Sequence, residues 1–441
     1  MPIVTLEVHT LGNRTHLVHD GAVAVAVDPP RDISLVERAA EEAEVDLVAV
    51  ADTHVHNDYV SGGLVLARRH GADYLLAADE PVTFERVGVR GGDTVTYGAL
   101  EVEVLATPGH TRHHQSFFVR TAGEPAALFS GGSLLLGTVG RTDLVDPRLA
   151  LHLAGQQWDS AVHQLDLAPE TLLLPTHGFG SFCAAAAVEP GDGPATIGGQ
   201  QDHPALSSER ADFASRLVLG FGPVPAYYPH MDPINRAGAG TPRSARRVTA
   251  EQLDAALATG HWVVDLRDRA THAAGHPAGT VGVEYGDQFA TYVGWLVPWR
   301  TVLILISDRP EHLTRAVTDL AGIGIEDVGV HLLHGPRPEA GFRRADWAAY
   351  AADRSPKVVV DVRQSDEYAE GHLPGAVHVP VQDIERSAAA LPPGELWVHC
   401  RSGYRAGIAA SLLHRHDRQV VHLDDQWVRV DELGLETVRA A

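Results

Sequence analysis

The chain has 441 residues, and its 57 Asp and Glu outnumber its 35 Lys and Arg, which gives a formal net charge of -22. This length predicts several domains, and so acidic a chain disfavours nucleic acid and anionic membranes as partners. Its only two cysteines, Cys183 and Cys400, exclude a disulfide framework and, together with an N-terminus that lacks a signal-peptide pattern, predict a reducing cytoplasm.

Residues 1 to about 235 show short apolar runs broken by Gly, Pro and Asp, with helical patterns between them. We expect strands at residues 23–27, 46–51, 100–105, 116–119 and 171–174, and helices at residues 62–69 and 159–165. Strands interleaved with helices indicate an α/β layered domain. The Gly-, Pro- and Arg-rich residues 237–247 then have the composition of a linker.

Histidines follow several of these strands. The run T-H-V-H-N-D-Y at residues 53–59 contains His54 and His56, which would project to the same side of an extended backbone. His110 and His177 each follow a later strand. Imidazole suits zinc, iron, copper or nickel, so four histidines at strand ends predict a metal site.

An internal repeat lies beyond the linker. The run W-V-V-D-L-R at residues 262–267 corresponds to V-V-V-D-V-R at residues 358–363. A Gly-His pair follows each at the same spacing, at residues 275–276 and 371–372, and a second apolar strand comes after it. Two similar α/β domains in tandem are expected.

The second repeat contains the chain's other cysteine in a suggestive loop. Residues 399–406 read H-C-R-S-G-Y-R-A and lead from an expected strand into a helical pattern. Such a loop turns backbone N–H groups toward Cys400 at the positive end of a helix dipole, and Arg401 and Arg405 add positive charge. Both effects favour the reactive thiolate over a buried structural cysteine.

These residues resemble a rhodanese, or sulfurtransferase, domain over nearly the whole last domain. The resemblance implies that Cys400 carries sulfane sulfur as a persulfide, with Arg401 and Arg405 in its catalytic loop. The middle repeat has I-S-D-R at residues 306–309 where the cysteine loop should be. It resembles a rhodanese domain without the thiol, and we expect it to pack or dock rather than carry sulfur.

The N-terminal histidine pattern resembles the metallo-β-lactamase superfamily, and within it the persulfide dioxygenase branch fused to two rhodanese domains. The G-R-T-D run at residues 140–143 and the domain order support this resemblance. It implies an α/β fold: an αββα metallo-β-lactamase sandwich at residues 1–240, then two α/β rhodanese-like domains. These are a pseudo-rhodanese domain at residues 248–346 and a rhodanese domain at residues 355–441.

The sequence departs from this family at two positions. Tyr59 stands where dinuclear zinc hydrolases of the superfamily have a histidine, and Gly132 stands where they have a bridging aspartate. Asp58 and His177 would then be the only ligands left at a second metal site. We expect these two residues to form a hydrogen-bonding outer shell instead.

The persulfide dioxygenase branch typically holds one ferrous iron with two histidines and the aspartate that Gly132 replaces. We therefore predict one Fe(II), with zinc as the alternative, bound by His54, His56 and His110. Cys183, Arg141 and Tyr59 are candidate substrate contacts, and a structural role is equally open for each.

The predicted function is oxidation of a persulfide to sulfite with O2, coupled to sulfane-sulfur transfer by Cys400 that forms or uses thiosulfate. This chemistry belongs to sulfide detoxification. Its partners would be a small persulfide or thiol, sulfite or thiosulfate, and O2; the carrier group and any homo-oligomer stay open. One alternative is a single-zinc thioester hydrolase of the glyoxalase II type. The other is a degenerate N-terminal scaffold that serves an active rhodanese.

Overall fold

The computed structural model of the chain describes residues 1–178, 182–185, 195–335 and 337–439. Its internal contacts divide it into two units. The first is Met1–Arg243 with Thr318–Gly324, and the second is Ser244–Val317 with Ile325–Ala441. Within the described residues, no helix combines the length and apolar character needed to cross a membrane.

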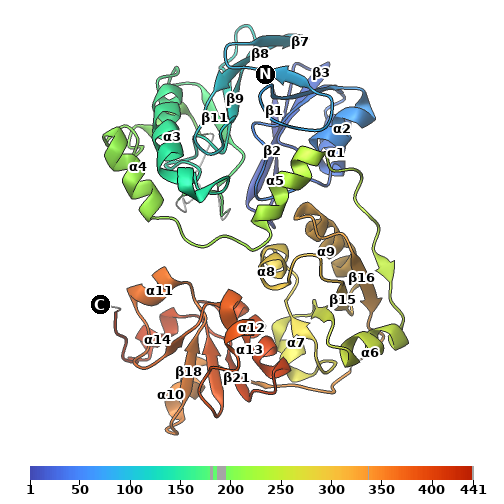
Figure 1. The fold of residues 1–441 in the computed structure, drawn as a ribbon, viewed down its shortest axis with the longest axis vertical. Helices are drawn as coiled ribbons and strands as arrows, with labels where there is room; N and C mark the ends of the chain where they lie inside the picture. Colours follow the sequence, from blue (N-terminus) through green and yellow to red (C-terminus); the bar gives the residue numbers. More distant parts are fainter. Residues whose placement is uncertain (179–181, 186–194, 336, 440–441) are drawn as a thin grey trace. The chain divides into compact units, whose positions relative to one another are not determined.

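The first unit contains two β-sheets (Figure 1). The six-stranded sheet has the order β1 (Ile3–Val8), β2 (Asn13–His19), β3 (Val23–Val27), β4 (Asp46–Ala51), β5 (Asp73–Ala77) and β6 (Val87–Val89). The five-stranded sheet has the order β11 (Leu172–Pro175), β10 (Ala127–Gly131), β9 (Gln115–Arg120), β8 (Leu100–Ala106) and β7 (Thr94–Tyr97). Strands β3, β4 and β5 run parallel, as do β10 and β11, so their carboxyl ends reach common edges.

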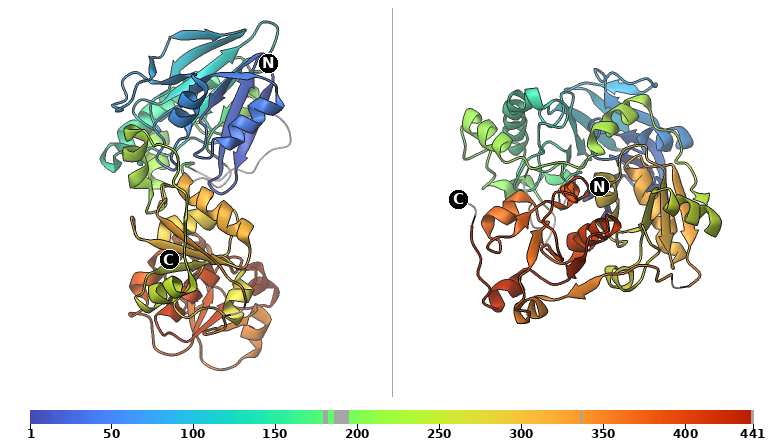
Figure 2. Two further views of the ribbon diagram at one scale, coloured as in Figure 1. Left: turned by 90° about the vertical axis from the view of Figure 1, so that its right-hand side faces the viewer. Right: turned by 60° about the horizontal axis from the view of Figure 1, so that its bottom comes forward.

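Three apolar layers hold this unit together. Val25, Ala49, Phe117 and Phe129 belong to one buried cluster that both sheets share. A second cluster covers the outer face of the first sheet with α1 (Ser34–Glu42) and α2 (Gly63–His70), and a third covers the second sheet with α3 (Ala150–Leu165) and α4 (Arg210–Leu219). Two further views show the same layering (Figure 2). The predicted αββα sandwich is confirmed, and α5 (Tyr228–Ala237) follows it.

The second unit contains two five-stranded parallel sheets with the same strand order. One is β12 (Arg246–Arg247), β16 (Val328–Leu332), β15 (Leu303–Ser307), β13 (Trp262–Asp265) and β14 (Val281–Gly282). The other is β17 (Arg343–Ala345), β21 (Val420–Leu423), β20 (Leu396–His399), β18 (Val358–Asp361) and β19 (Val377–His378). The sequence repeat therefore corresponds to a repeated fold.

Short helices connect these strands. In the first repeat they are α6 (Ala250–Ala258), α7 (Arg269–Ala274), α8 (Phe289–Leu296) and α9 (Pro310–Gly322). In the second they are α10 (Trp347–Ala352), α11 (Ser365–Glu370), α12 (Ile384–Ser387), α13 (Tyr404–Arg415) and α14 (Val428–Glu432). Strand β17 pairs with β21, so the last repeat begins before residue 355, where the sequence pattern suggested its start.

Candidate functional site

Three buried histidines of the first unit bring their ring nitrogens together. His54 follows the carboxyl end of β4, His110 follows β8, and His177 follows β11. Each offers a ligand atom within 4.8 Å of the other two, and none of the three residues is more than 1% exposed. Their ring centroids are 4.8 to 5.4 Å apart. An arrangement of this kind is typical of a metal site.

An oxygen atom fixes the Nδ1 side of each ring. The Nδ1 atoms of His54, His110 and His177 lie 2.9 Å from Thr53 Oγ1, 2.7 Å from the Arg141 carbonyl oxygen and 3.0 Å from Asn13 Oδ1. The Thr53 hydroxyl donates to Asp28, and the Asn13 amide nitrogen donates to Asp58, so these oxygens accept from the rings. Each histidine then carries its proton on Nδ1 and keeps the Nε2 lone pair free.

The free Nε2 atoms face one another. Those of His54 and His177 are 3.4 Å apart. The Nε2 atom of His110 is buried without a hydrogen-bond partner among the described residues. A buried lone pair without a donor is costly, which indicates that this position normally receives a ligand.

Electrostatics keep the three imidazoles neutral. Burial lowers the pKa of His110 to about 3, and burial also lowers the pKa values of His54 and His177. Neutral imidazole is the form that binds a metal ion. The donor set therefore fits a divalent transition-metal ion, which these three histidines would hold.

His56, which the sequence suggested as a third ligand, is engaged differently. Its Nε2 atom lies 2.9 Å from the Tyr59 hydroxyl and 3.2 Å from Asp28 Oδ1. Burial alone would lower the pKa of His56, but the Asp28 carboxylate raises it above the usual value. The geometry therefore favours His177, rather than His56, as the partner of His54 and His110.

Asp58 lies beside this triad. Its Oδ2 atom accepts from the Asn13 amide and is 3.3 Å from His177 Nδ1. Its other oxygen, Oδ1, is buried without a partner in the described part of the chain, as is His56 Nδ1. His56, Asp58 and His177 also bring ligand atoms within 4.8 Å of one another. Asp58 is thus placed to orient His177 and to take part in hydrogen bonding at the site.

Glycine at position 132 is a steric requirement of this arrangement. A Cβ atom on Gly132 would lie 2.3 Å from Cδ2 and 2.6 Å from Nε2 of His110. A Cβ atom on Gly140 would lie 2.7 Å from His110 Nδ1. The His110 ring thus packs against backbone at both glycines. An aspartate at position 132 would have to displace the ring.

The three candidate substrate contacts are all buried. Cys183 is fully buried, its sulfur is 4.0 Å from the Tyr228 hydroxyl, and burial raises the pKa of the thiol well above its usual range. Arg141 forms a bidentate ion pair with Asp143 and is 5% exposed. Tyr59 donates its hydroxyl to the Asp28 carbonyl. These contacts give Arg141 and Tyr59 positions within the framework that surrounds the site.

The structure adds functional neighbours that the sequence pattern did not single out. Asn13 and the Arg141 backbone carbonyl orient two of the histidines. His114 stacks on His54, with ring centroids 4.9 Å apart, and its Nε2 accepts from the Gly132 amide at 3.0 Å. The spacing of His114, four residues after His110, was a usable signal. No sequence signal pointed to Asn13, because it lies at the start of β2, far from these histidines in the sequence.

In the second unit, Cys400 lies directly between β20 and α13. Cys400 is 1% exposed, and its sulfur accepts a hydrogen bond from the Ala406 amide at 3.4 Å. Gly403 caps the helix with a φ of 87°, where a Cβ atom would lie 2.2 Å from Asp424 Oδ1. Only glycine fits this turn, so the predicted strand–loop–helix arrangement around the cysteine is present.

The two arginines of the loop differ in their surroundings. Arg405 pairs with both oxygens of Glu367, at 2.5 and 2.8 Å. Arg401 is exposed, and its guanidinium has no ion-pair partner among the described residues. Arg405 therefore stabilises the loop through Glu367, while Arg401 is available to an incoming anion.

The middle repeat places a serine at the equivalent position. Asp265 pairs with Ile306 in the first sheet as Asp361 pairs with His399 in the second, so Ser307 corresponds to Cys400. The Arg309 amide donates to the Ser307 hydroxyl at 3.1 Å. This repeat keeps the loop position without a thiol.

Comparison with known proteins gives matches to both units. The Rhodanese-like domain family matches residues 344–432. A hydroxyacylglutathione hydrolase-like protein from Bos taurus is 33% identical over 146 residues, which cover 32% of this chain and 75% of that protein. A metallo-β-lactamase structure from Staphylococcus aureus subsp. aureus COL has a TM-score of 0.66 and 25% identity, and the match covers 75% of this chain and 98% of that one.

A structure of ETHE1 from Myxococcus xanthus has a TM-score of 0.46 and 29% identity, and the match covers 54% of this chain and all of that one. The chain spans about half the length of several other curated relatives that it matches.

Proposed function

Because the chain belongs to the metallo-β-lactamase-fold family of hydroxyacylglutathione hydrolase-like proteins and carries a rhodanese-like domain, we propose that it is a sulfur-metabolism enzyme. It oxidises a persulfide to sulfite at a single-metal centre formed by His54, His110 and His177. It also transfers sulfane sulfur through Cys400.

The observation that carries this proposal is the combination of a histidine triad with a rhodanese loop. The triad has three neutral donors, and by the family resemblance Gly132 stands where dinuclear hydrolases have a bridging carboxylate. The rhodanese loop supplies a thiol of the kind that accepts sulfane sulfur. One chain thus contains a site suited to a single metal ion and a site suited to covalent sulfur transfer.

The oxidation balances as follows: R–S–SH, O2 and H2O give R–SH, sulfite and two protons. The terminal sulfur loses four electrons and O2 gains them. A bound Fe(II) ion would supply Lewis acidity and redox chemistry toward O2. The chain itself contributes three oriented neutral imidazoles, the Asp58 carboxylate beside His177, and burial that excludes bulk water.

Sulfur transfer at Cys400 is a separate reaction. The Cys400 thiolate attacks the outer sulfur of R–S–SH, the bond between the two sulfurs breaks, and its electron pair leaves with R–S⁻. Sulfite then attacks the outer sulfur of the Cys400 persulfide, which forms thiosulfate and regenerates the thiolate. The Ala406 amide donates to the Cys400 sulfur and stabilises its anionic form.

Metal analysis combined with turnover tests the proposal. Protein reconstituted with iron should contain one ion per chain, consume O2 with glutathione persulfide and release sulfite. Cys400→Ser protein should retain this oxidation. An absence of O2 uptake with both glutathione persulfide and coenzyme A persulfide would contradict the dioxygenase assignment.

A thioester hydrolase of the glyoxalase II type is the second candidate, favoured by the 33% identity to a hydroxyacylglutathione hydrolase-like protein. Tyr59 and Gly132 weigh against it, because they replace two residues of the dinuclear zinc site. Zinc-loaded protein that hydrolyses S-lactoylglutathione, with no O2 uptake in the iron form, would select this function instead.

A further inference from the structure

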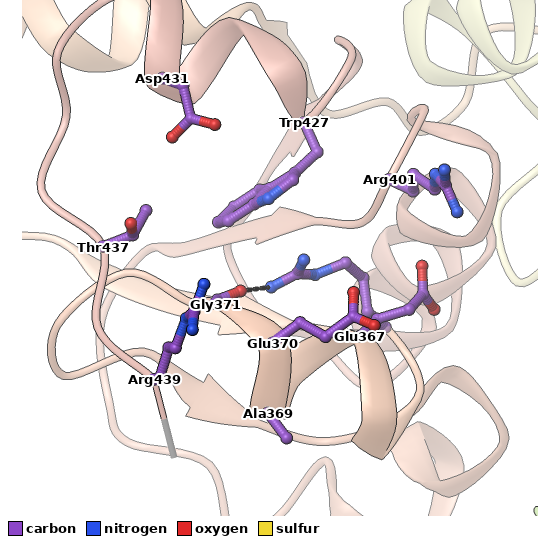
Figure 3. A pocket seen from close by; sticks show the side chains of 10 residues that line it. Glu367, Ala369, Glu370, Gly371, Arg401, Trp427, Asp431, Thr437 and Arg439 are labelled. Carbon is purple, nitrogen blue, oxygen red and sulfur yellow. Dashed lines mark hydrogen bonds between the residues drawn. The ribbon is translucent and has the colours of Figure 1, made fainter. Parts of the chain in front are cut away.

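A large cavity lies beside the cysteine loop of the last repeat (Figure 3). Its volume is about 980 Å³, which is near the upper end of the range for small-molecule sites. Arg401 lies on one side of the view, and Thr437 and Arg439 lie on the other. A site for sulfite or thiosulfate alone would not need this space.

The cavity is joined to the Cys400 loop through two of its lining residues. Arg401 follows Cys400 directly, and its carbonyl oxygen accepts from the Trp427 amide at 2.8 Å. Glu367 lines the cavity and pairs with Arg405 of the same loop. A ligand in the cavity would therefore lie next to the residues that hold the cysteine.

Contacts within the wall of the cavity hold two of its side chains, Arg363 and Trp427, in place. The Arg363 guanidinium lies 3.9 Å from the centre of the Trp427 ring and forms an ion pair with Asp361. The His399 ring stacks on Trp427 at an angle of 12°. These contacts occupy Arg363 and Trp427, so recognition of a ligand falls to the other lining side chains.

Those side chains carry both signs of charge. Arg401 and Arg439 offer guanidinium groups, and Glu370 and Asp431 offer carboxylates. All four are exposed, and none has an ion-pair partner among the residues that the structure describes. The unpaired charges therefore balance, in a chain whose net charge is -22.

We propose that this cavity binds the carrier of the sulfane sulfur, and that the carrier is an amino-acid-derived thiol with both carboxylate and ammonium groups. Carboxylates pair with Arg401 and Arg439, and an ammonium group pairs with Glu370 or Asp431. A carrier with several phosphates is disfavoured, because the cavity has no excess of positive charge and the chain is strongly acidic. The proposal rests on the proposed sulfur transfer at Cys400.

Binding places the persulfide end of the carrier toward Cys400. The thiolate takes the outer sulfur, the sulfur–sulfur bond of the carrier breaks, and the carrier leaves as its thiolate. No external oxidant or reductant is needed. The charged groups of the cavity position the carrier and do not take part in bond making.

Calorimetric titration of full-length Cys400→Ser protein with S-methylglutathione, a carrier analogue that cannot transfer sulfur, tests the site directly. Arg439→Gln and Asp431→Asn should each weaken binding about tenfold, the effect of losing one partly exposed charge-assisted contact. Arg429→Gln is the matched control, because Arg429 lies on α14 with Asp431 but does not line the cavity. It should leave the affinity unchanged.

In the otherwise unaltered enzyme, Arg439→Gln should raise the KM for glutathione persulfide about tenfold and leave the KM for thiosulfate unchanged. Equal affinity in all variants, or coenzyme A binding more tightly than S-methylglutathione, would overturn the proposal. If the proposed function fails instead, no donor will label Cys400 with sulfur. S-methylglutathione will still bind, and Arg439→Gln will still weaken its binding.

Discussion

The histidine centre and the cysteine loop are built in contrasting ways. His54, His110 and His177 come from three separate segments, and Asn13 orients one of them from a fourth. The cysteine loop is a single turn between β20 and α13. A contiguous site depends on one short segment, such as the loop that has Ser307 in place of the cysteine, whereas an assembled site changes ligand by ligand. Substitutions at the two sites test this difference.

The largest effect is expected at the contiguous site. Cys400→Ser should reduce sulfur transfer to the uncatalysed rate, because the only nucleophile of the loop is gone. Cyanide-dependent formation of thiocyanate from thiosulfate measures this transfer. Cys183→Ser is the matched control and should keep it, because Cys183 belongs to the first unit. Normal transfer by the Cys400→Ser protein would refute the assigned role.

A thiol alone should not give the equivalent loop of the middle repeat sulfur-transfer activity. Gly403 has a φ of 87°, and by strand register its counterpart is Pro310, whose ring fixes φ near -65°. Ser307→Cys in the Cys400→Ser background should therefore remain inactive in the same assay. Recovery of transfer would show that the cysteine is the only difference that matters between the repeats.

At the assembled site, the choice of third ligand gives the next largest effect. His177→Ala should lower metal affinity by more than about 100-fold, beyond the 10- to 100-fold range typical of outer-shell losses. His56→Ala should fall within that range, because His56 contacts Asp28 and Tyr59. Competition with a chelator measures both, with circular dichroism to verify folding. If His56→Ala lowered metal affinity more than His177→Ala, the metal ligands would instead be His54, His56 and His110.

Most of the fold could be predicted from the sequence because its signals are local. Apolar runs, Gly and Pro breaks and the repeated V-V-D-x-R pattern identified the strands, and the fold class is confirmed by the layered structure and the similar proteins. The Cys400 loop was equally accessible, since its strand, turn and helix are adjacent in sequence. The start of the last repeat was harder to predict, because β17 is only three residues long.

The place of His177 in the proposed metal centre could not be predicted in this way. The prediction for His56 assumed an extended backbone, in which alternate side chains share a side. Strand β4 ends at Ala51, so that rule does not apply to residues 54 and 56. The direction of the His56 ring is determined by Asp28, which reaches it from the end of β3. Contacts between distant segments of this kind are invisible to a single sequence.

A smaller effect is expected at Gly132. Gly132→Ala should destabilise the first unit by about 1–3 kcal/mol, because its Cβ would overlap the His110 ring. Metal affinity should fall as well, since the ring is a ligand of the proposed centre. Denaturant unfolding and chelator competition measure the two effects. Gly222→Ala is the control, because no atom lies within 4 Å of its added Cβ.

The smallest effect concerns pH and the cysteine loop. His422 donates from Nε2 to the Gly403 carbonyl at 2.8 Å, its Nδ1 is buried without a partner among the described residues, and burial lowers the pKa of His422 to about 4. The unfolded chain, with an ordinary pKa of 6.5, therefore binds more protons between pH 6.5 and 4. Stability is fully present above pH 6.5 and is lost as pH falls through this window.

From pH 7 to pH 5.5 the loss from this one group is about 1 kcal/mol. Denaturant unfolding of the intact protein at the two pH values measures it. His422→Gln should remove that share of the pH dependence, because glutamine cannot take up a proton. An identical pH dependence in the variant would show that His422 does not couple protonation to the stability of the cysteine loop.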